Sequence, residues 1–271
     1  MAPFFADLAR LAAKRPEQPW LFFRRELDWR WRSHRQVADH FARGAAAIGA
    51  AGVRATTALP LVGAESLAAL FASLAAGAEF RPLEDAAAEA SFLTPQEARW
   101  PDLLPQGLAQ PVLELPAARG NIDRYQPAPL EPAQDGALVV GGRRWTVADL
   151  EREAARIAQG LFAGDPPGKK IVHAGARLDA PAAAATMIAT LGEGTVLALE
   201  PYPPATVESI LWVRPTHLVA HAEEVAALVA AWTEKHGKRS RLRRVVAVGE
   251  IEPNWSAVLG APVESFTSGA G

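Results

Sequence analysis

Residues 139–200 read VVGGRRWTVADLEREAARIAQGLFAGDPPGKKIVHAGARLDAPAAAATMIATLGEGTVLALE, and this stretch decides the fold. The Gly-Gly pair predicts a two-residue turn between two strands. Apolar residues at three- and four-residue steps then predict an amphipathic helix over residues 147–162, with Thr146 as N-cap and Asp149 as its capping-box partner. A strand at 169–174, a helix at 180–191 and a strand at 196–200 follow. Strands alternating with helices in this way favour parallel sheets.

The same order of elements occurs once before, within residues 26–84. There the pattern predicts a helix over 33–51, a strand over 56–62, a helix over 65–76 that ends at Gly77, and a strand at 80–84. Ser33 and Gln36 form the equivalent capping box. Two copies of a pattern about 60 residues long are typical of two similar subdomains and not of a solenoid.

Further elements are predicted after the second copy: helices at 207–213 and 223–236, and strands at 216–220, 244–248 and 262–266. The fold class is therefore α/β, with two similar subdomains whose mainly parallel sheets are flanked by helices. We expect subdomains at 1–84 and 135–271. Residues 85–134 are rich in proline and predict a connector packed on the surface, with a short strand at 111–115. A free linker is the alternative, which the apolar residues of this segment disfavour.

Composition and motifs exclude several classes of protein. Lys and Arg number 28 against 30 Asp and Glu, so no global basic field supports nucleic-acid binding. The absence of cysteine excludes disulfides, Cys-ligated zinc and thiolate catalysis. Neither a nucleophile elbow nor a dinucleotide fingerprint occurs. Without a signal peptide or an apolar run that could span a membrane, we expect a cytoplasmic protein.

His217 and His221, four residues apart, are the pair that most resembles a metal site. Pro215 and the strand at 216–220 predict that the two histidines lie on different elements, which does not suit the ligand geometry of a helical pair. We therefore expect no metal site there.

Two motifs frame the repeat: Arg-Trp-Thr-x-x-x-Leu at 144–150 and Ala-Gly-Ala-x-Phe-x-Pro-Leu at 76–83. Together with the ordered pieces that follow, they resemble the N-terminal part of adenylate-forming enzymes, which comprise acyl-CoA synthetases, luciferases and peptide-synthetase adenylation domains. The pieces that carry the resemblance are residues 8–16, 20–22, 37–52, 75–83, 214–218, 242–250 and 260–269. The resemblance also implies the two similar α/β subdomains that the repeat predicts.

The resemblance implies a pocket for a small carboxylic acid or acyl group. His173 follows a strand at its carboxyl end, where open α/β sheets place ligands, although a buried structural histidine is the alternative. Gly249 and Glu250 also follow a strand, and the aromatic and hydroxyl residues from Phe266 onward match a motif of the family. The candidate substrate-binding residues are His173, Gly249, Glu250, Phe266, Thr267, Ser268 and Gly269.

ATP or AMP and CoA are the cofactors that the resemblance implies, but the sequence departs from the family in three places. Gly141-Gly142-Arg143-Arg144 stands where we expect the Ser/Thr/Gly-rich phosphate loop. The motif at 266–270 lacks the carboxylate that would serve magnesium. The ribose-binding aspartate and catalytic lysine of the C-terminal domain have no counterpart. We therefore assign no catalytic residue and no certain cofactor.

Two functions remain open at this stage. The first is an AMP-ligase or acyl-CoA-synthetase-like module, truncated and degenerate, that keeps an acyl pocket but does not adenylate alone. The second is a non-catalytic pseudo-enzyme acting as a binding or scaffold subunit. A third, acyl transfer, lacks an evident nucleophile. The basic stretch from Lys235 to Arg244 is either a solvated helix terminus or a docking patch for an acyl carrier protein, a partner subunit or CoA phosphates.

Overall fold

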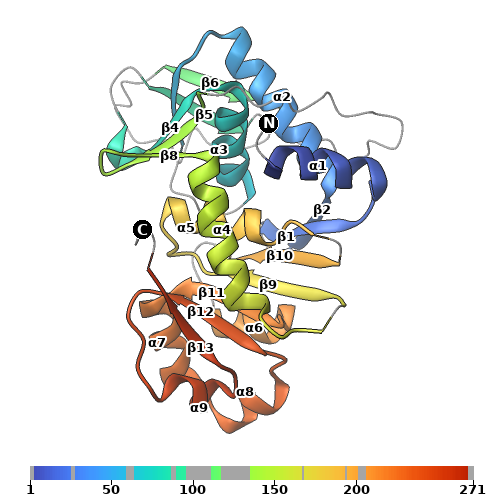
Figure 1. The fold of residues 1–271 in the computed structure, drawn as a ribbon, viewed down its shortest axis with the longest axis vertical. Helices are drawn as coiled ribbons and strands as arrows, with labels where there is room; N and C mark the ends of the chain where they lie inside the picture. The colour runs from blue at the N-terminus through green and yellow to red at the C-terminus, as the bar shows by residue number, and fades with distance from the viewer. Residues whose placement is uncertain are drawn as a thin grey trace. The chain divides into compact units, whose positions relative to one another are not determined.

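The computed structural model describes residues 3–25, 28–58, 64–86, 90–95, 111–116, 135–166, 168–192, 194–200 and 206–267. The chain divides into two compact units, each built from two segments. Unit 1 is Met1–Gln18 with Arg32–Asp149, and unit 2 is Pro19–Trp31 with Leu150–Gly271. Each unit carries one mainly parallel sheet with helices against it (Figure 1), which confirms the predicted α/β class.

Unit 1 contains a six-stranded sheet in the order β6-β5-β3-β4-β7-β8. All pairs are parallel except the hairpin of β7 and β8. Its elements are α1 (Pro3–Lys14), α2 (His34–Ala50), β3 (Ala55–Ala58), α3 (Ala64–Ala76), β4 (Glu79–Pro82), the 3-10 helix η1 (Leu83–Asp85), β5 (Ser91–Pro95), β6 (Val112–Leu115), β7 (Ala137–Val140) and β8 (Arg143–Thr146).

Unit 2 contains the larger sheet, in the order β13-β12-β11-β9-β10-β1-β2. The pairs from β13 through β1 are parallel. Its elements are β1 (Pro19–Arg25), β2 (Asp28–Ser33), α4 (Val147–Phe162), β9 (Lys170–Ala174), α5 (Ala180–Ala189), β10 (Thr195–Leu199), α6 (Thr206–Val213), β11 (His217–His221), α7 (Ala222–Ala231), α8 (Glu234–Arg239), β12 (Arg244–Val248), α9 (Trp255–Leu259) and β13 (Val263–Phe266). β2 and α4 run from the segments of one unit into those of the other.

The two sequence copies exchange their opening hairpins. In the first copy, β1 and β2 precede α2, yet β1 pairs with β10, the last strand of the second copy. In the second copy, β7 and β8 precede α4, yet β7 pairs with β4, the last strand of the first copy. Five consecutive strands of the two sheets consequently follow the same order, β5-β3-β4-β7-β8 in one and β11-β9-β10-β1-β2 in the other.

Local sequence signals set several of these boundaries as predicted. Ser33 and Gln36 form a reciprocal capping box at the start of α2, with Ser33 N–H donating to Gln36 Oε1 at 2.9 Å. Thr146 N–H donates to Asp149 Oδ2 at 2.8 Å at the start of α4. Gly141 and Gly142 have φ values of 54° and 75°, the left-handed pair that a tight hairpin turn requires.

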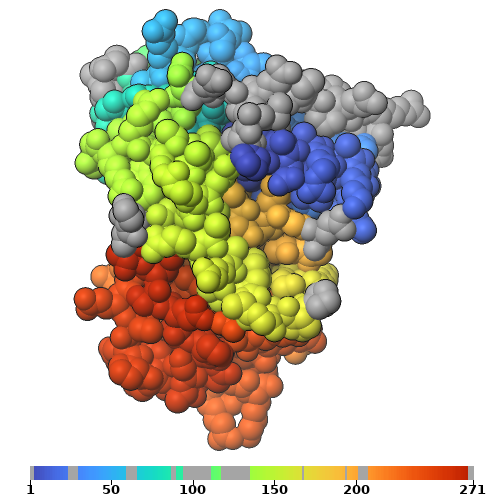
Figure 2. All heavy atoms as spheres, in the orientation of Figure 1, coloured from blue at the N-terminus to red at the C-terminus, as the bar shows by residue number. Residues whose placement is uncertain are grey.

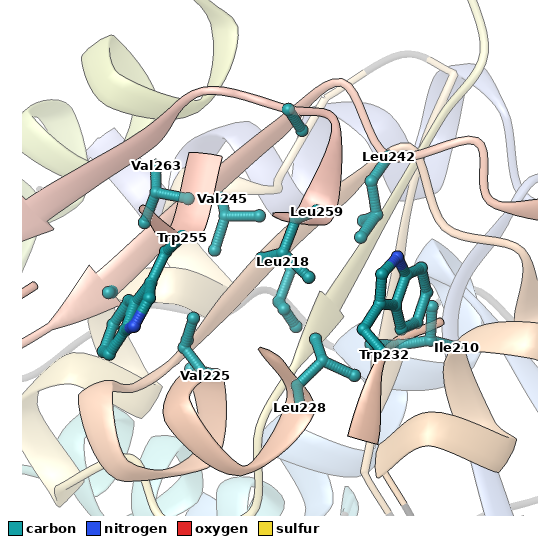
Figure 3. Packing of buried hydrophobic residues seen from close by; sticks show 13 residues of the cluster. Ile210, Leu218, Val225, Leu228, Trp232, Leu242, Val245, Trp255, Leu259 and Val263 are labelled. Carbon is teal, nitrogen blue, oxygen red and sulfur yellow. The ribbon is translucent and has the colours of Figure 1, made fainter. Parts of the chain in front are cut away.

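The core of unit 2 lies where α7 and α9 pack on β11 and β12. Val225 and Leu228 of α7 face Leu218 and Val245 of the sheet (Figure 3). Trp232 lies at one end of this cluster and is buried, with 8% of its surface exposed. In the space-filling view the orange and red atoms of the C-terminal part of the chain form one continuous surface (Figure 2).

Two sequence predictions need correction, and one helix was not predicted. The single helix expected over 223–236 is two helices, because the backbone of Trp232 turns extended to place its ring in the core and Thr233 begins a new helix. His217 and His221 lie on one strand, β11, and not on different elements. The helix α9 was not expected at all.

Part of the proline-rich segment 85–134 belongs to the sheet. β5 lies between β3 and β6, and β6 forms the edge next to it. Most of the remainder of this segment lies outside the described residues. The division into subdomains at 84 and 135 stays a prediction beside the two units observed. In the part of the chain that the structure describes, no helix combines the length and apolar character needed to cross a bilayer.

Candidate functional site

The carboxyl ends of four parallel strands meet along one edge of the sheet of unit 2. β9, β11, β12 and β13 are neighbours in that sheet and end at Ala174, His221, Val248 and Phe266. Open α/β sheets bind ligands in the crevice beyond these ends, since the loops that leave the strands gather there. We call this region the carboxyl edge.

Gly249 and Phe266 lie together at the carboxyl edge. Gly249 N–H donates to Phe266 O at 2.9 Å, and Ser265 Oγ donates to Gly249 O at 2.7 Å. The φ of Gly249 is 118°, a backbone conformation that side-chain-bearing residues rarely adopt. A Cβ there would also lie 3.1 Å from Ala222 Cβ. The glycine therefore lets the chain leave β12 and turn across the end of β13.

Arg156 of α4 contacts the carboxyl end of β13. The guanidinium of Arg156 lies 5.0 Å from the centre of the Phe266 ring, and its Nη2 donates to Thr267 O at 3.4 Å. Its Nη1 donates to both carboxylate oxygens of Glu153, at 3.2 and 2.9 Å. The Arg156 side chain is 42% exposed, so this held cation still meets solvent beside the aromatic ring.

A buried carboxylate closes the carboxyl edge between β9 and β11. Glu224 Oε1 accepts Ala176 N–H at 2.9 Å, and its Oε2 accepts His221 N–H at 3.2 Å. Glu224 is 6% exposed. A Cβ on Gly175 would lie 2.3 Å from Glu224 Oε2, so the glycine is what allows the carboxylate to reach the loop after β9. Glu224 thereby joins the start of α7 to that loop.

His173 belongs to a polar network in the interior. His173 Nε2 lies 2.5 Å from Glu200 Oε2, and Ser209 Oγ donates to Glu200 Oε1 at 3.1 Å. The side chains of His173 and Glu200 are fully buried. The network joins β9, the end of β10 and α6. Glu200 lies between Ser209 and His173 and contacts both. In a hydrolytic triad the histidine contacts the hydroxyl directly, so this network does not have that arrangement.

The predicted site residues therefore fall into separate places. Gly249 and Phe266 are brought together, and Thr267 follows them at the surface. Glu250 is exposed in the loop after β12. His173 is buried two strands away from β12, with Glu200 as its partner. Ser268 and Gly269 lie outside the described residues.

Two residues at the carboxyl edge were missed by the sequence analysis, Arg156 and Glu224. Arg156 belongs to the polar face of an amphipathic helix, where an exposed cation gives no signal of its own. The capping-box position of Glu224, three residues after His221, was the available signal. Among the described residues, no group of three or more His, Asp or Glu side chains is arranged to hold a metal ion.

No protein-family model and no curated protein matches the chain in sequence. Solved structures do match its fold. The nonribosomal peptide synthetase FmoA3 matches with a TM-score of 0.70 at 19% identity, over 97% of this chain and 31% of that one. Acetoacetyl-CoA synthetase from Streptomyces lividans matches with a TM-score of 0.69 at 17% identity, over 98% of this chain and 51% of that one.

A third structure, the fatty acyl-adenylate ligase from L. pneumophila in complex with acyl adenylate and pyrophosphate, matches with a TM-score of 0.64 at 14% identity. The alignment covers 94% of this chain and 51% of that chain. This chain thus spans between about a third and a half of the length of these three structures. Nearly all of it has the fold of the N-terminal part of adenylate-forming enzymes.

Proposed function

We propose that this chain is the acid-binding part of an adenylate-forming ligase and holds a carboxylic acid or acyl group at the carboxyl edge of unit 2. The arrangement of Arg156 over Phe266 is the observation that carries the proposal. A guanidinium binds a carboxylate through parallel N–H donors, and an aromatic ring beside it offers an apolar surface for the rest of the acid. The two hydrogen bonds to Glu153 fix the direction of the guanidinium before any ligand arrives.

The fold supports the same class of chemistry. The structures that match it include a ligase in complex with an acyl adenylate and a CoA synthetase. Beyond β13, residues 267–271 read Thr-Ser-Gly-Ala-Gly. Hydroxyls and glycines directly after a strand are typical of loops whose backbone N–H groups bind phosphate. ATP or AMP is therefore the cofactor that we propose to test at this end of the sheet.

We propose further that the chain does not adenylate an acid by itself. Where the sequence analysis expected a phosphate loop, Gly141 and Gly142 form a tight turn between β7 and β8. Arg143 lies over the Trp145 ring and Arg144 pairs with Glu79, so both arginines of that turn have partners within unit 1. The pieces that activate an acid would then come from further sequence or from another protein. The scaffold function named above is the second candidate, favoured by this hairpin.

Binding of carboxylic acids tests the main proposal. Isothermal titration calorimetry with a panel of aryl and fatty acids, each paired with its neutral amide, should show that at least one acid binds about tenfold or more tightly than its amide. Arg156→Gln should remove that preference. Arg152→Gln, which neutralises an exposed arginine one turn earlier on α4, is the matched control and should keep it. Equal affinity for acid and amide in the unmodified chain would contradict the proposal.

Exchange of labelled pyrophosphate into ATP, measured in the presence of an acid that binds, tests the second part. We expect no exchange above background from this chain alone. Robust exchange would show that the chain adenylates unaided and would leave the acid-binding proposal standing. A chain that binds no acid but forms a stable complex with an acyl carrier protein would favour the scaffold function.

A further inference from the structure

A second concave site lies at the opposite end of the same sheet, where β9, β11 and β12 begin. It is a pocket of about 500 Å³ lined by Lys169, Ile171, Arg214, Thr216, Arg241 and Arg243. Lys169, Thr216 and Arg243 each immediately precede one of these three parallel strands. Because the strands are parallel, this amino end faces away from the carboxyl edge, so the pocket is distinct from the site proposed above.

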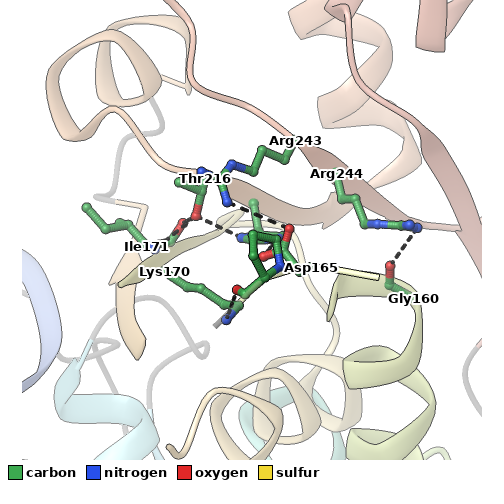
Figure 4. A network of polar contacts seen from close by, with 9 residues as sticks. Gly160, Asp165, Lys170, Ile171, Thr216, Arg243 and Arg244 are labelled. Carbon is green, nitrogen blue, oxygen red and sulfur yellow. Dashed lines mark hydrogen bonds and ion pairs between the residues drawn. The ribbon is translucent and has the colours of Figure 1, made fainter. Parts of the chain in front are cut away.

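The pocket collects four cations from three segments of the chain. Asp165 approaches it, with its Oδ1 3.8 Å from Arg243 Nη1 (Figure 4), but the same carboxylate also lies 3.3 Å from His217. Within the described residues, no carboxylate lies within ion-pair distance of Lys169, Arg214 or Arg241. Like charges repel, so an excess of cations in one hollow is costly until an anion enters it.

Basic residues next to the pocket differ from the pocket cations because they pair with acceptors of the protein. Lys170 Nζ donates to Pro166 O, and Arg244 pairs with Glu264 and donates to Gly160 O (Figure 4). Lys238 pairs with Glu234 on α8. These cations contact acceptors of the fold or of their own helix, whereas of the four pocket cations only Arg243 has a carboxylate, Asp165, within ion-pair distance among the described residues.

The chain places two arginines at the pocket on either side of a buried residue. Leu242 belongs to the core, whereas its neighbours Arg241 and Arg243 are exposed and both line the pocket. Arg214 directly follows α6 and has a φ of 52°, a position where glycine is usual, and the following Pro215 disfavours the helical alternative. The chain thus places an arginine in a conformation that costs free energy, at the wall of this pocket.

Hydrogen bonds connect the strand starts that line the pocket. Thr216 Oγ1 accepts Ile171 N–H at 3.0 Å and lies 3.1 Å from Ile171 O, and Arg243 N–H donates to Thr216 O at 2.7 Å (Figure 4). These bonds join the starts of β9, β11 and β12. The cations therefore project from a fixed base, and binding an anion does not require the base to order.

We infer that this pocket binds a small molecule bearing two or more phosphate groups. Guanidinium forks match phosphate oxygens bidentately, and a ligand with several negative charges is needed to balance four cations. A volume of about 500 Å³ suits a small molecule and not a protein segment with its own fold. Within the basic stretch from Lys235 to Arg244, Arg241 and Arg243 line the pocket, whereas Lys235 and Lys238 lie on α8.

Titration with inorganic tripolyphosphate, compared with orthophosphate, tests the inference on the full chain at near-physiological salt. Tripolyphosphate should bind at least about tenfold more tightly than orthophosphate, because it meets several cations at once. The variant Lys169→Gln with Arg241→Gln should lose about tenfold or more of that affinity. Lys235→Gln with Arg239→Gln removes the same charge from exposed positions on α8 and should change the affinity by less than about twofold.

Three results would overturn the inference. The first is equal loss in the pocket variant and the α8 variant, which would show diffuse attraction by net charge. The second is absence of tripolyphosphate binding to a chain whose circular dichroism shows it folded. The third is an acidic carrier protein that binds through these residues without competition from tripolyphosphate. Arg156→Gln should leave tripolyphosphate binding unchanged, so failure here and failure of the acid-binding proposal can be told apart.

Discussion

Gly175→Ala tests the closure of the carboxyl edge by Glu224. A Cβ at this position would lie 2.3 Å from Glu224 Oε2 and 2.9 Å from Ala220 Cβ, so the carboxylate must move. Moving it breaks the hydrogen bonds from Ala176 N–H and His221 N–H. Hydrogen bonds to a charged group contribute about 1.5–3 kcal/mol each, so Gly175→Ala should lower the free energy of unfolding by about 2–4 kcal/mol.

The second half of this prediction is a double-mutant cycle. Glu224→Ala alone should cost about 3–5 kcal/mol, since it removes both hydrogen bonds and the capping box. Adding Gly175→Ala to Glu224→Ala should then cost at least about 1 kcal/mol less than Gly175→Ala alone, because the oxygen is gone and only the 2.9 Å contact with Ala220 Cβ remains. Urea unfolding followed by tryptophan fluorescence, with Trp232 and Trp255 in the adjoining core, measures each step. Additivity of the two changes within about 0.5 kcal/mol would refute the reasoning.

Three further predictions concern unit 1. Burial lowers the pKa of His34 from 6.5 to about 4. Between these two pH values only the unfolded chain binds a proton at this histidine, so the free energy of unfolding should fall by up to about 3 kcal/mol as the pH drops from 6.5 to about 4. Urea unfolding at several pH values should show that the free energy of unfolding of His34→Gln depends less on pH than that of the unmodified chain. The same pH dependence for both proteins would contradict the prediction. Ser33→Ala removes the hydroxyl that accepts Gln36 N–H at the start of α2 and should cost about 1 kcal/mol by the same assay. Gly142→Ala forces a side chain to a φ of 75° and should lower the free energy of unfolding, whereas Gly49→Ala in open space on α2 should raise it, each by about 1 kcal/mol or less. Thermal melts that change alike for both glycines would count against this interpretation.

Elements governed by local rules were predictable from the sequence. The bounds of α4 agree because an apolar stripe, an N-cap at Thr146 and a carboxylate at Asp149 all indicate the same start. β12 agrees because the continuous apolar run of residues 245–248 is typical of a strand buried on both faces. The Gly-Gly hairpin agrees because its turn type demands left-handed residues.

Elements that depend on distant partners were not predictable. The periodicity of 223–236 is helical throughout, and the burial of the Trp232 ring in the core accompanies the break. No local signal says that Pro19–Arg25 pairs with β10, whose residues lie more than 150 positions further along the chain. His173 was correctly placed on a strand, but its partners Glu200 and Ser209 come from two other elements, and only the assembled fold shows that they enclose it.

The exchange of opening hairpins between the two sequence copies has a consequence for biogenesis. While the chain is being made, β4 emerges long before its partner β7, so the first sheet exposes an unpaired edge until residues beyond 140 have been synthesised. In the second sheet the early strand is β1, which is synthesised near the start of the chain and has no partner until β10 has been made. Each sheet therefore needs strands from both the early and the late part of the chain. Two fragments cut between residues 96 and 110 should therefore reassemble by strand complementation when they are expressed together, and each should aggregate when expressed alone.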